Sequence, residues 1–212
     1  MRDIPVLTTS SGVASLTLKE IPYKGIAYIR LQDTLEPEFL LKECVDFCRM
    51  AGAEHVYATG HEILRRYPLH TAVIQMSCAR DCLPQTDAAL FPVLDNTLQE
   101  WMDIYNRTME NVPNSATMTI GDGQDLLKTG DGYFVHRDDV LLGIGKASCN
   151  KIDVVVSLIP GSGRDVLLAL CNALADDRVT VEVASANTRA IHLYQRLGFI
   201  QTAEIARWYK IS

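Results

Sequence analysis

Residues 179–199 constrain the fold most, because a strand, a break and a helix follow one another directly in this stretch. Val179 to Val183 is rich in β-branched side chains, so it is expected to form a strand. Asn187 is a good N-cap for a following helix, and Gly198 is well placed to end it. Apolar or aromatic side chains recur at helical spacing at Ala190, Ile191, Tyr194 and Leu197. The stretch therefore predicts a strand followed by an amphipathic helix.

The spacing of Asn187 and Tyr194 bears on chemistry. They lie about two helical turns apart, so their side chains share one azimuth and are separated by roughly 10 Å along the axis. A capping amide and a phenol would then line one groove. A purely structural reading is also open, in which Asn187 only caps the helix and Tyr194 packs its ring with the hydroxyl at the rim.

Further positions of this helix fit one register, N-x-x-A-x-x-L-Y-x-x-x-G-F. They are Asn187, Ala190, Leu193, Tyr194, Gly198 and Phe199. This pattern resembles the strand–helix signature near the C-terminus of the GNAT superfamily of acyl-CoA N-acyltransferases. The resemblance implies that Asn187 contacts the acyl-CoA and that Tyr194 is the general acid that protonates the leaving thiolate.

Composition and charge narrow the class of protein. The 212 residues are 48% hydrophobic and 22% charged, which suits one globular domain or one domain with a smaller companion. A formal net charge of −6 argues against nonspecific nucleic-acid binding, which needs clustered positive charge. There is no apolar run of membrane-spanning length and no signal-peptide core near the N-terminus, so a cytoplasmic protein without membrane association is expected.

The cysteines lack the spacing of ordinary zinc sites, so no metal is expected. They are Cys44, Cys48, Cys78, Cys82, Cys149 and Cys171. Most are expected to be reduced and buried as small hydrophobic side chains.

The chain divides into two blocks around a polar segment that contains prolines. The first block, 1–82, is predicted to be a subdomain, 83–93 a linker and 94–212 the main domain. The strands expected in the first block are 13–20, 25–32, 55–58 and 71–77, and its helices are 36–50 and 62–67.

The second block predicts the elements that carry the resemblance. They are a helix from about residue 95, a hairpin at 133–148, a strand at 151–159, a helix at 163–175, the strand and helix described above, and a last strand at 200–209. This order is similar to that of GNAT proteins. It implies an α/β (α+β) fold with a mixed, mainly antiparallel central sheet flanked by helices. The first block has the element order of 133–212 and resembles a degenerate half-copy without the signature, although β-α-β order also recurs by chance.

The stretch LIPGSGRDVL, 158–167, reads as a strand that ends in a glycine turn opening a helix. Free backbone N–H groups and the helix dipole make such a turn an anion site. The resemblance implies that the pyrophosphate of CoA sits here. The implied acetyl-CoA contacts are Leu158, Ile159, Gly161, Ser162, Gly163, Arg164, Asp165 and Asn187.

The glycine turn also departs from the family pattern. Leu158 stands where the family has a basic or amide side chain, and the loop is shorter than usual. Asp165 adds a negative charge in the first helical turn, which Arg164 can offset by pairing with phosphate. These departures weaken the case for tight binding of CoA.

Glu182 is the candidate general base. It lies between two valines on a strand expected to be covered on both faces, where a carboxylate is costly unless it is solvated or paired. The stretch V-E-V-x-x-x-N is similar to the L-E-V-x-x-x-N of ribosomal-protein N-terminal acetyltransferases. That likeness implies a base role, although many relatives keep an acidic residue there without one.

The predicted function is direct transfer of an acetyl group from acetyl-CoA to a primary amine of a small molecule or a protein. A backbone N–H near Leu158 is expected to polarise the thioester carbonyl. Two other functions stay open: a CoA-binding or structural protein without transferase activity, and an interaction module whose first block forms a homodimer. The acceptor amine is not specified by the sequence, and 94–130 is the segment expected to select it.

Overall fold

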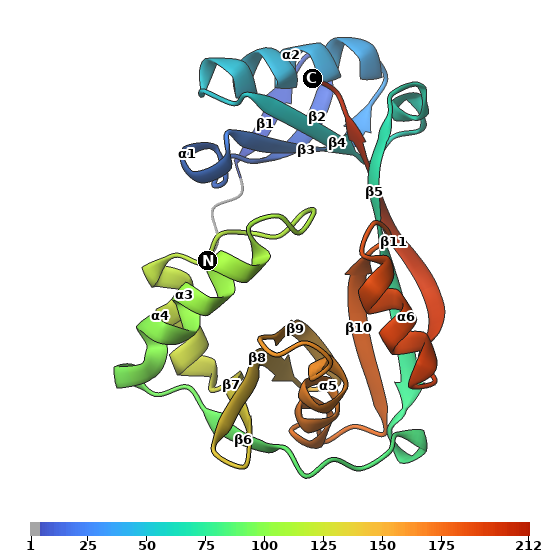
Figure 1. The fold of residues 1–212 in the computed structure, drawn as a ribbon. Helices are drawn as coiled ribbons and strands as arrows, with labels where there is room; N and C mark the ends of the chain where they lie inside the picture. Colours follow the sequence, from blue (N-terminus) through green and yellow to red (C-terminus); the bar gives the residue numbers. More distant parts are fainter. Residues whose placement is uncertain (1–4) are drawn as a thin grey trace. The chain divides into compact units, whose positions relative to one another are not determined.

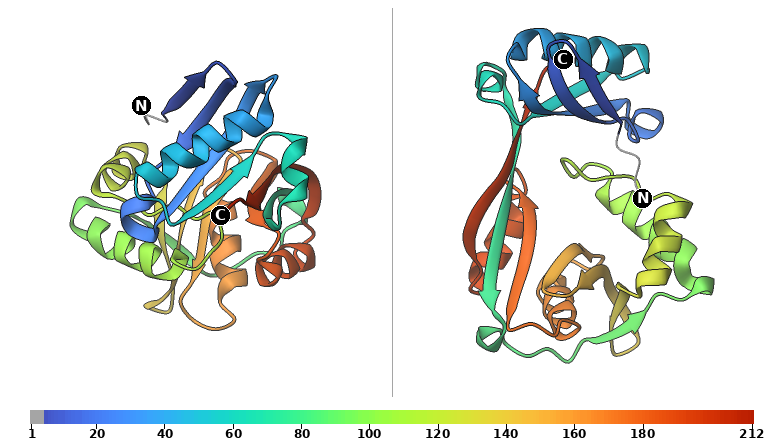
Figure 2. Two further views of the ribbon diagram at one scale, coloured as in Figure 1. Left: turned by 90° about the horizontal axis from the view of Figure 1, so that it is seen from above. Right: turned by 180° about the vertical axis from the view of Figure 1, so that it is seen from behind.

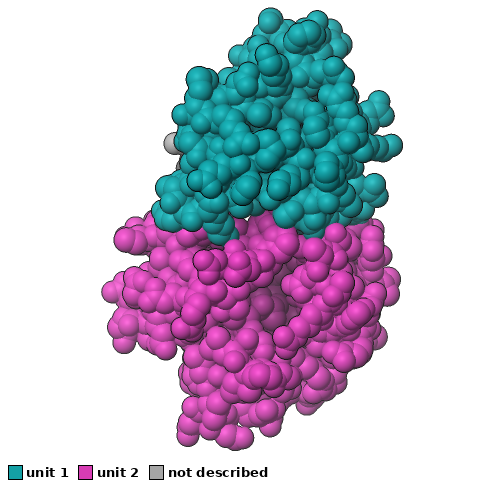
Figure 3. All heavy atoms as spheres, turned by 45° about the horizontal axis from the view of Figure 1, so that its top comes forward, with its two compact units in different colours: residues 1–73, 204–212 teal, residues 74–203 magenta. Residues whose placement is uncertain are grey.

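The computed structural model describes residues 5–212. The chain forms two compact units: unit 1 consists of residues 1–73 and 204–212, and unit 2 of residues 74–203 (Figure 3). Two strands, β5 (Leu69–Ala79) and β11 (Ile200–Lys210), begin in one unit and end in the other. The units therefore differ from the segments 1–82 and 94–212 expected from the sequence, because the last strand leaves the unit in which it starts.

Unit 1 contains a sheet with one covering helix. Its remaining strands are β1 (Val6–Thr9), β2 (Gly12–Thr17), β3 (Ile26–Thr34) and β4 (His55–Thr59), and its helices are α1 (Ile21–Lys24), α2 (Pro37–Met50) and the 3-10 helix η1 (Glu62–Arg66). The strand order is β1-β2-β3-β4-β11. β3 and β4 are parallel and are joined by α2, and the other pairs are antiparallel. Figure 1 and Figure 2 show α2 lying across these strands, where Leu40 and Cys44 are fully buried.

Unit 2 continues the sheet with a second set of strands. These are β6 (Ala89–Pro92), β7 (Gly132–Arg137), β8 (Val140–Ser148), β9 (Lys151–Ser157) and β10 (Arg178–Ala184). Its helices are η2 (Arg80–Cys82), η3 (Asp95–Thr97), α3 (Leu98–Met109), α4 (Ile120–Thr129), α5 (Gly163–Asn172) and α6 (Thr188–Arg196). The strand order is β11-β5-β10-β9-β8-β7-β6. β9 and β10 are parallel, and β6 to β9 pair antiparallel.

β6 corrects the prediction that 83–93 is a linker. Leu90 pairs with Val135 and Phe91 with Phe134 on β7. β6 is the last strand in the order, and an edge strand tolerates a proline such as Pro92 because one side of its ladder needs no N–H. The prolines of this segment therefore mark a short edge strand.

Apolar side chains fill both faces of the unit 2 sheet. One core lies under α3, where Trp101 is fully buried and its Nε1 donates to the carbonyl of Tyr133 at 3.1 Å. The other lies under α5 and α6. Figure 1 shows α3 and α5 on opposite sides of β7 and β8. No helix among residues 5–212 has the length and apolar character needed to cross a membrane.

The order of elements repeats between the units. Apart from the short helix α1 between β2 and β3, the order β1-β2-β3-α2-β4-η1-β5 matches that of β7-β8-β9-α5-β10-α6-β11. In each set the third and fourth strands are parallel and a helix joins them. The predicted mixed, mainly antiparallel sheet flanked by helices is confirmed, whereas the half-copy origin of the first block stays a prediction.

Candidate functional site

The parallel pair β9 and β10 is the centre of the candidate site. Within the described part of the chain, these strands pair at two positions, Thr180 with Lys151 and Val181 with Ile152. β9 nevertheless continues to Ser157 and β10 to Ala184. Beyond the last pair, the N–H and C=O groups of β9 that point toward β10 are not paired with it, so they can bond to another partner. The pair therefore opens toward the carboxyl ends of both strands.

The hydrogen bonds to β8 decide which amides face this opening. The N–H of Leu158 donates to the carbonyl of Leu142 at 2.9 Å, so the donor predicted near Leu158 would have to be a neighbouring amide. Successive N–H groups of a strand point to opposite edges, and Val156 pairs with Ile144 in the same register as Leu158. The N–H groups of Val155 and Ser157 therefore point to the β10 side.

A tight turn joins β9 to α5. The Oγ of Ser162 lies 2.9 Å from the Oγ of Ser157 and 3.1 Å from the carbonyl oxygen of Leu142, so this buried hydroxyl holds the turn in place. Gly161 has a φ of 90°, which disfavours any residue with a Cβ, although the space around it is open. The first bond within α5 runs from the N–H of Val166 to the carbonyl of Ser162 at 3.0 Å.

The start of α5 therefore presents backbone donors. The N–H groups of Gly163, Arg164 and Asp165 come before the first i to i−4 bond of the helix. The positive end of the helix dipole adds to their attraction for an anion. The guanidinium of Arg164 is half exposed beside them.

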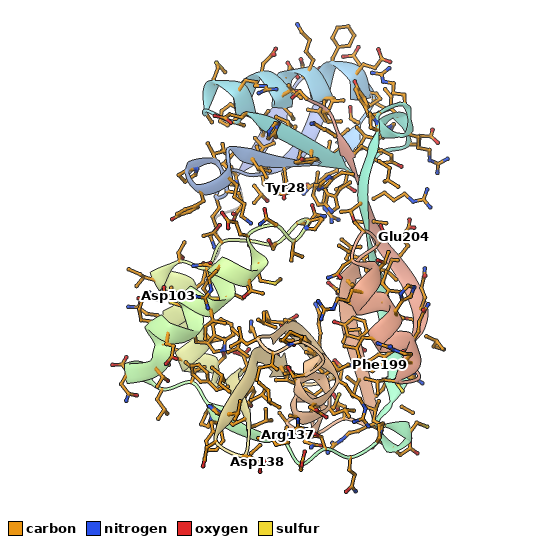
Figure 4. All side chains as sticks on the ribbon, viewed as in Figure 1. Tyr28, Asp103, Arg137, Asp138, Phe199 and Glu204 are labelled. Carbon is orange, nitrogen blue, oxygen red and sulfur yellow. The ribbon has the colours of Figure 1, made fainter. Side chains whose placement is uncertain are left out.

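Asp165 has a counterion that the sequence analysis missed. The Nη1 of Arg137 donates to its Oδ2 at 2.9 Å, and the Oγ1 of Thr86 lies 3.5 Å from its Oδ1. Figure 4 shows Arg137 reaching from the end of β7 toward α5. The carboxylate is largely buried, with 16% of the side chain exposed. Arg137 therefore partly neutralises the charge of Asp165. This contact forms only when the β7–β8 hairpin is folded.

Asn187 lies at the start of α6, as predicted, and Tyr194 lies in its last turn. The Oδ1 of Asn187 accepts the N–H of Ala190 at 3.1 Å, which confirms the helix cap. Tyr194 is buried, and its ring centroid lies 5.7 Å from that of Phe199. Burial raises the pKa of the Tyr194 phenol to about 12, and the nearby Cys171 adds to the effect. Tyr194 is therefore uncharged at neutral pH and can donate a proton or a hydrogen bond.

Glu182 lies on the other face of β10. Val181 and Val183 are buried in the core that holds Tyr194, and alternation along the strand points Glu182 away from it. The expectation that β10 is covered on both faces is wrong, since the Glu182 side chain is 35% exposed. Its Oε1 lies 3.1 Å from the Nζ of Lys151. Solvent and this ion pair together meet the cost of placing a carboxylate here.

Lys151 links Glu182 to a second carboxylate, Asp153, which the sequence analysis passed over within an apolar run. The Nζ of Lys151 lies 3.1 Å from an oxygen of each. Partial burial acts to lower the pKa of Lys151, but the hydrogen bonds that its ammonium donates to Glu182 and Asp153 outweigh it and raise the pKa above its ordinary value. The charged residues Lys151 and Asp153 in an otherwise apolar strand were the sequence feature that could have predicted this group.

Among the cysteines, Cys171 lies near Tyr194 in the core under α5 and α6. All are free thiols, and Cys82 and Cys149 are exposed whereas the other four are buried. In residues 5–212, no three His, Cys, Asp or Glu side chains are arranged to hold a metal ion.

Comparison with known proteins identifies the fold through structure and not through sequence. No family model matches the chain, and no curated protein sequence matches it significantly. A functionally unknown conserved protein from Staphylococcus epidermidis aligns with a TM-score of 0.61 at 10% identity, over 99% of this chain and 94% of that one. A GCN5-related N-acetyltransferase from Kribbella flavida aligns with a TM-score of 0.58 at 13% identity, over 99% and 90%.

A third structure gives the same result over less of its length. A GCN5-related N-acetyltransferase from Anabaena variabilis aligns with a TM-score of 0.58 at 14% identity, over 86% of this chain and 54% of that one. Identities this low speak for the fold alone. The strand order, the parallel pair that opens, and these alignments agree with the resemblance drawn from residues 187–199, and the chain has the fold of the GNAT N-acetyltransferases.

Proposed function

We propose that this protein is an N-acetyltransferase that transfers the acetyl group of acetyl-CoA directly to a primary amine. The observation that carries the proposal is the early end of the β9–β10 pairing, next to the exposed donors at the start of α5. An extended ligand with a phosphate group at one end and amides along its length suits both features. CoA has that chemistry.

The binding roles follow from the donors on each element. The N–H groups of Gly163, Arg164 and Asp165, with the Arg164 guanidinium, would hold the pyrophosphate. The free edge of β9 can hydrogen-bond to the amides of the pantetheine arm, as an edge strand does with an added peptide. Leu158, Ile159 and Gly161 shape the turn, Ser162 stabilises it, and Asn187 fixes the start of α6 beside the arm.

The chemical roles fall on the two faces of β10. The N–H of Val155 or Ser157 would polarise the thioester carbonyl as charge develops on its oxygen. Glu182 would take a proton from the incoming amine, directly or through water, on the exposed face. Tyr194 would protonate the departing thiolate from the buried face, where its raised pKa keeps the phenol protonated.

A calorimetric titration with acetyl-CoA, followed by a CoA-release assay with a panel of primary amines, tests the proposal. Saturable binding with release of CoA that depends on an amine is the expected result. Binding without turnover on any amine would replace the proposal with a CoA-binding protein. If acetyl-CoA does not bind, the protein would share the fold of the GNAT N-acetyltransferases but not their function.

A further inference from the structure

We propose that this protein acetylates its own Lys151, an inference that rests on the proposed acetyl transfer. Lys151 forms the first of the two β9–β10 pairs, so it lies where the strands are still joined and one residue before they open. A ligand that lies along the free edge of β9 from the α5 end must stop at this junction, because the ladder closes there. The reactive end of such a ligand, whose thioester carbonyl accepts from the N–H of Val155 or Ser157, would therefore be the part of it nearest to Lys151.

The surroundings of Lys151 supply a base to the same amine. Its Nζ lies 3.1 Å from the Oε1 of Glu182 and 3.1 Å from the Oδ1 of Asp153. A general base needs to lie within hydrogen-bond reach of the proton it removes, and Glu182 meets that requirement. Lys151 is thus an amine already placed as an acceptor.

The group is open to solvent and ligand. The side chains of Lys151, Glu182 and Asp153 are 37%, 35% and 32% exposed. The Nζ of Lys146 also lies 3.8 Å from the Oδ2 of Asp153, and the contacts of Lys151 with Glu182 and Asp153 keep Lys151 protonated at rest. The amine becomes nucleophilic when Glu182 accepts its proton.

The Lys151 ammonium gives one proton to Glu182, which later passes it to solvent. The neutral nitrogen attacks the thioester carbon, an N–C bond forms, and the C–S bond breaks as the tetrahedral adduct collapses. The thiolate takes a proton from Tyr194, and the second proton lost by the nitrogen passes through solvent to the Tyr194 phenolate. The products are acetyl-lysine and free CoA, with no oxidant or reductant.

Lys128 provides an internal comparison. It also pairs with a carboxylate, since its Nζ lies 3.3 Å from the Oδ1 of Asp125, and it is more exposed, at 74%. It lies near the end of α4, away from the β9–β10 junction. Uncatalysed acetylation should therefore favour Lys128, whereas transfer within the site should favour Lys151.

The test is to incubate the purified full chain with acetyl-CoA and follow each lysine by peptide mass spectrometry over time. Lys151 should be acetylated about a hundredfold faster than Lys128, and at a rate per molecule that does not change with protein concentration. Glu182→Gln and Tyr194→Phe should each remove that excess and leave the rate at Lys128 unchanged. Lys151→Arg keeps the positive charge and should abolish the modification.

The outcomes separate this inference from the proposed function. Acetylation of Lys151 at the rate of Lys128, or at a rate that rises with protein concentration, would overturn self-acetylation. Turnover on added amines with Lys151 unmodified would overturn it and leave the transferase standing. Failure to bind acetyl-CoA together with failure to release CoA would overturn both.

Discussion

The parallel crossover of unit 1 and that of unit 2 are built from the same elements but differ in how long their strands stay together. β3 and β4 pair at every position from Ile26 with His55 to Arg30 with Thr59. β9 and β10 pair at Lys151 and Ile152 and then stop. A continuous ladder uses its own backbone donors, so unit 1 has no free edge to offer a ligand at the corresponding place.

The N-terminal turns of α2 and α5 also differ in how well they can bind an anion. α2 begins with Pro37 between the N-cap Glu36 and Glu38, so its first turn lacks one N–H and carries one carboxylate beside that of the cap. The N–H of Glu36 is also taken up by the Oγ1 of Thr34 at 3.0 Å. α5 begins after a glycine turn, and Asp165 in its first turn has Arg137 as a counterion. The same crossover is therefore suited to an anion in unit 2 alone.

The elements after the crossovers complete the contrast. α6 places Tyr194 in the core, whereas the shorter 3-10 helix η1 is followed by Tyr67, whose hydroxyl accepts from the exposed Arg66 at 3.4 Å. A repeated order of elements thus need not repeat a site. What separates the units is a few hydrogen bonds at strand ends and helix starts.

Removing the phenol of Tyr194 is expected to have the largest effect. Tyr194→Phe should lower turnover about a hundredfold or more, because the leaving thiolate loses its proton donor. Affinity for acetyl-CoA should stay within about twofold, since the ring remains. Steady-state kinetics with calorimetry measures both. Tyr67→Phe, the corresponding change in unit 1, should alter neither, and an unchanged turnover in Tyr194→Phe would remove this residue from the mechanism.

Reversing the charge of Arg164 at the start of α5 is expected to have the second largest effect. Arg164→Glu should weaken acetyl-CoA binding about 10- to 100-fold, because one charge-assisted contact to phosphate is lost and a repulsion is added. Lys128→Glu makes the same change of net charge on α4 and should leave the affinity unaltered. The wild type should bind a single molecule per chain in the titration. A second molecule bound by unit 1 would contradict the conclusion that only the crossover of unit 2 is suited to an anion.

The alkaline stability of unit 2 should depend on Tyr194. Its folded pKa, about 12, lies above the unfolded value of about 10, so its stabilising effect is complete below roughly pH 10 and is lost as pH rises toward the folded pKa. Urea unfolding should show the wild type losing about 1 kcal/mol more than Tyr194→Phe between roughly pH 9 and pH 11. An equal loss in both proteins would mean that the phenol titrates normally.

Local patterns predicted the part of the site that lies close together in the chain. The strand expected at 179–183 is β10, and Asn187 caps α6 through its own side chain. Both depend on residues within a few positions of each other, where propensity and capping rules apply. The GNAT fold was predicted from the same stretch.

Contacts between distant strands were not predictable in this way. That the Leu158 amide bonds to Leu142 follows from the register of β8 on β9. That Glu182 is exposed and reaches Lys151 depends on which face of β10 the helices cover. The pairing of Asp165 with Arg137 joins residues far apart in sequence through the β7–β8 hairpin. Sequence pattern gives the faces of each element but not which elements meet.

The smallest effect should come from removing the charge of Asp165, since the first turn of α5 carries a carboxylate as the first turn of α2 does. Asp165→Asn removes the carboxylate from the first turn of α5 and leaves Arg137 with its longer ion pair to Asp87, so acetyl-CoA should bind roughly threefold more tightly. The folded protein should lose about 1 kcal/mol in urea unfolding, since a partly buried ion pair is gone. Asp87→Asn is the matched control, because Asp87 also lies near Arg137, at 3.6 Å, but is 75% exposed and is not part of α5. Weaker binding in Asp165→Asn would mean that the Arg137 pair holds the turn in its binding shape, and that its structural effect exceeds the electrostatic cost of the carboxylate.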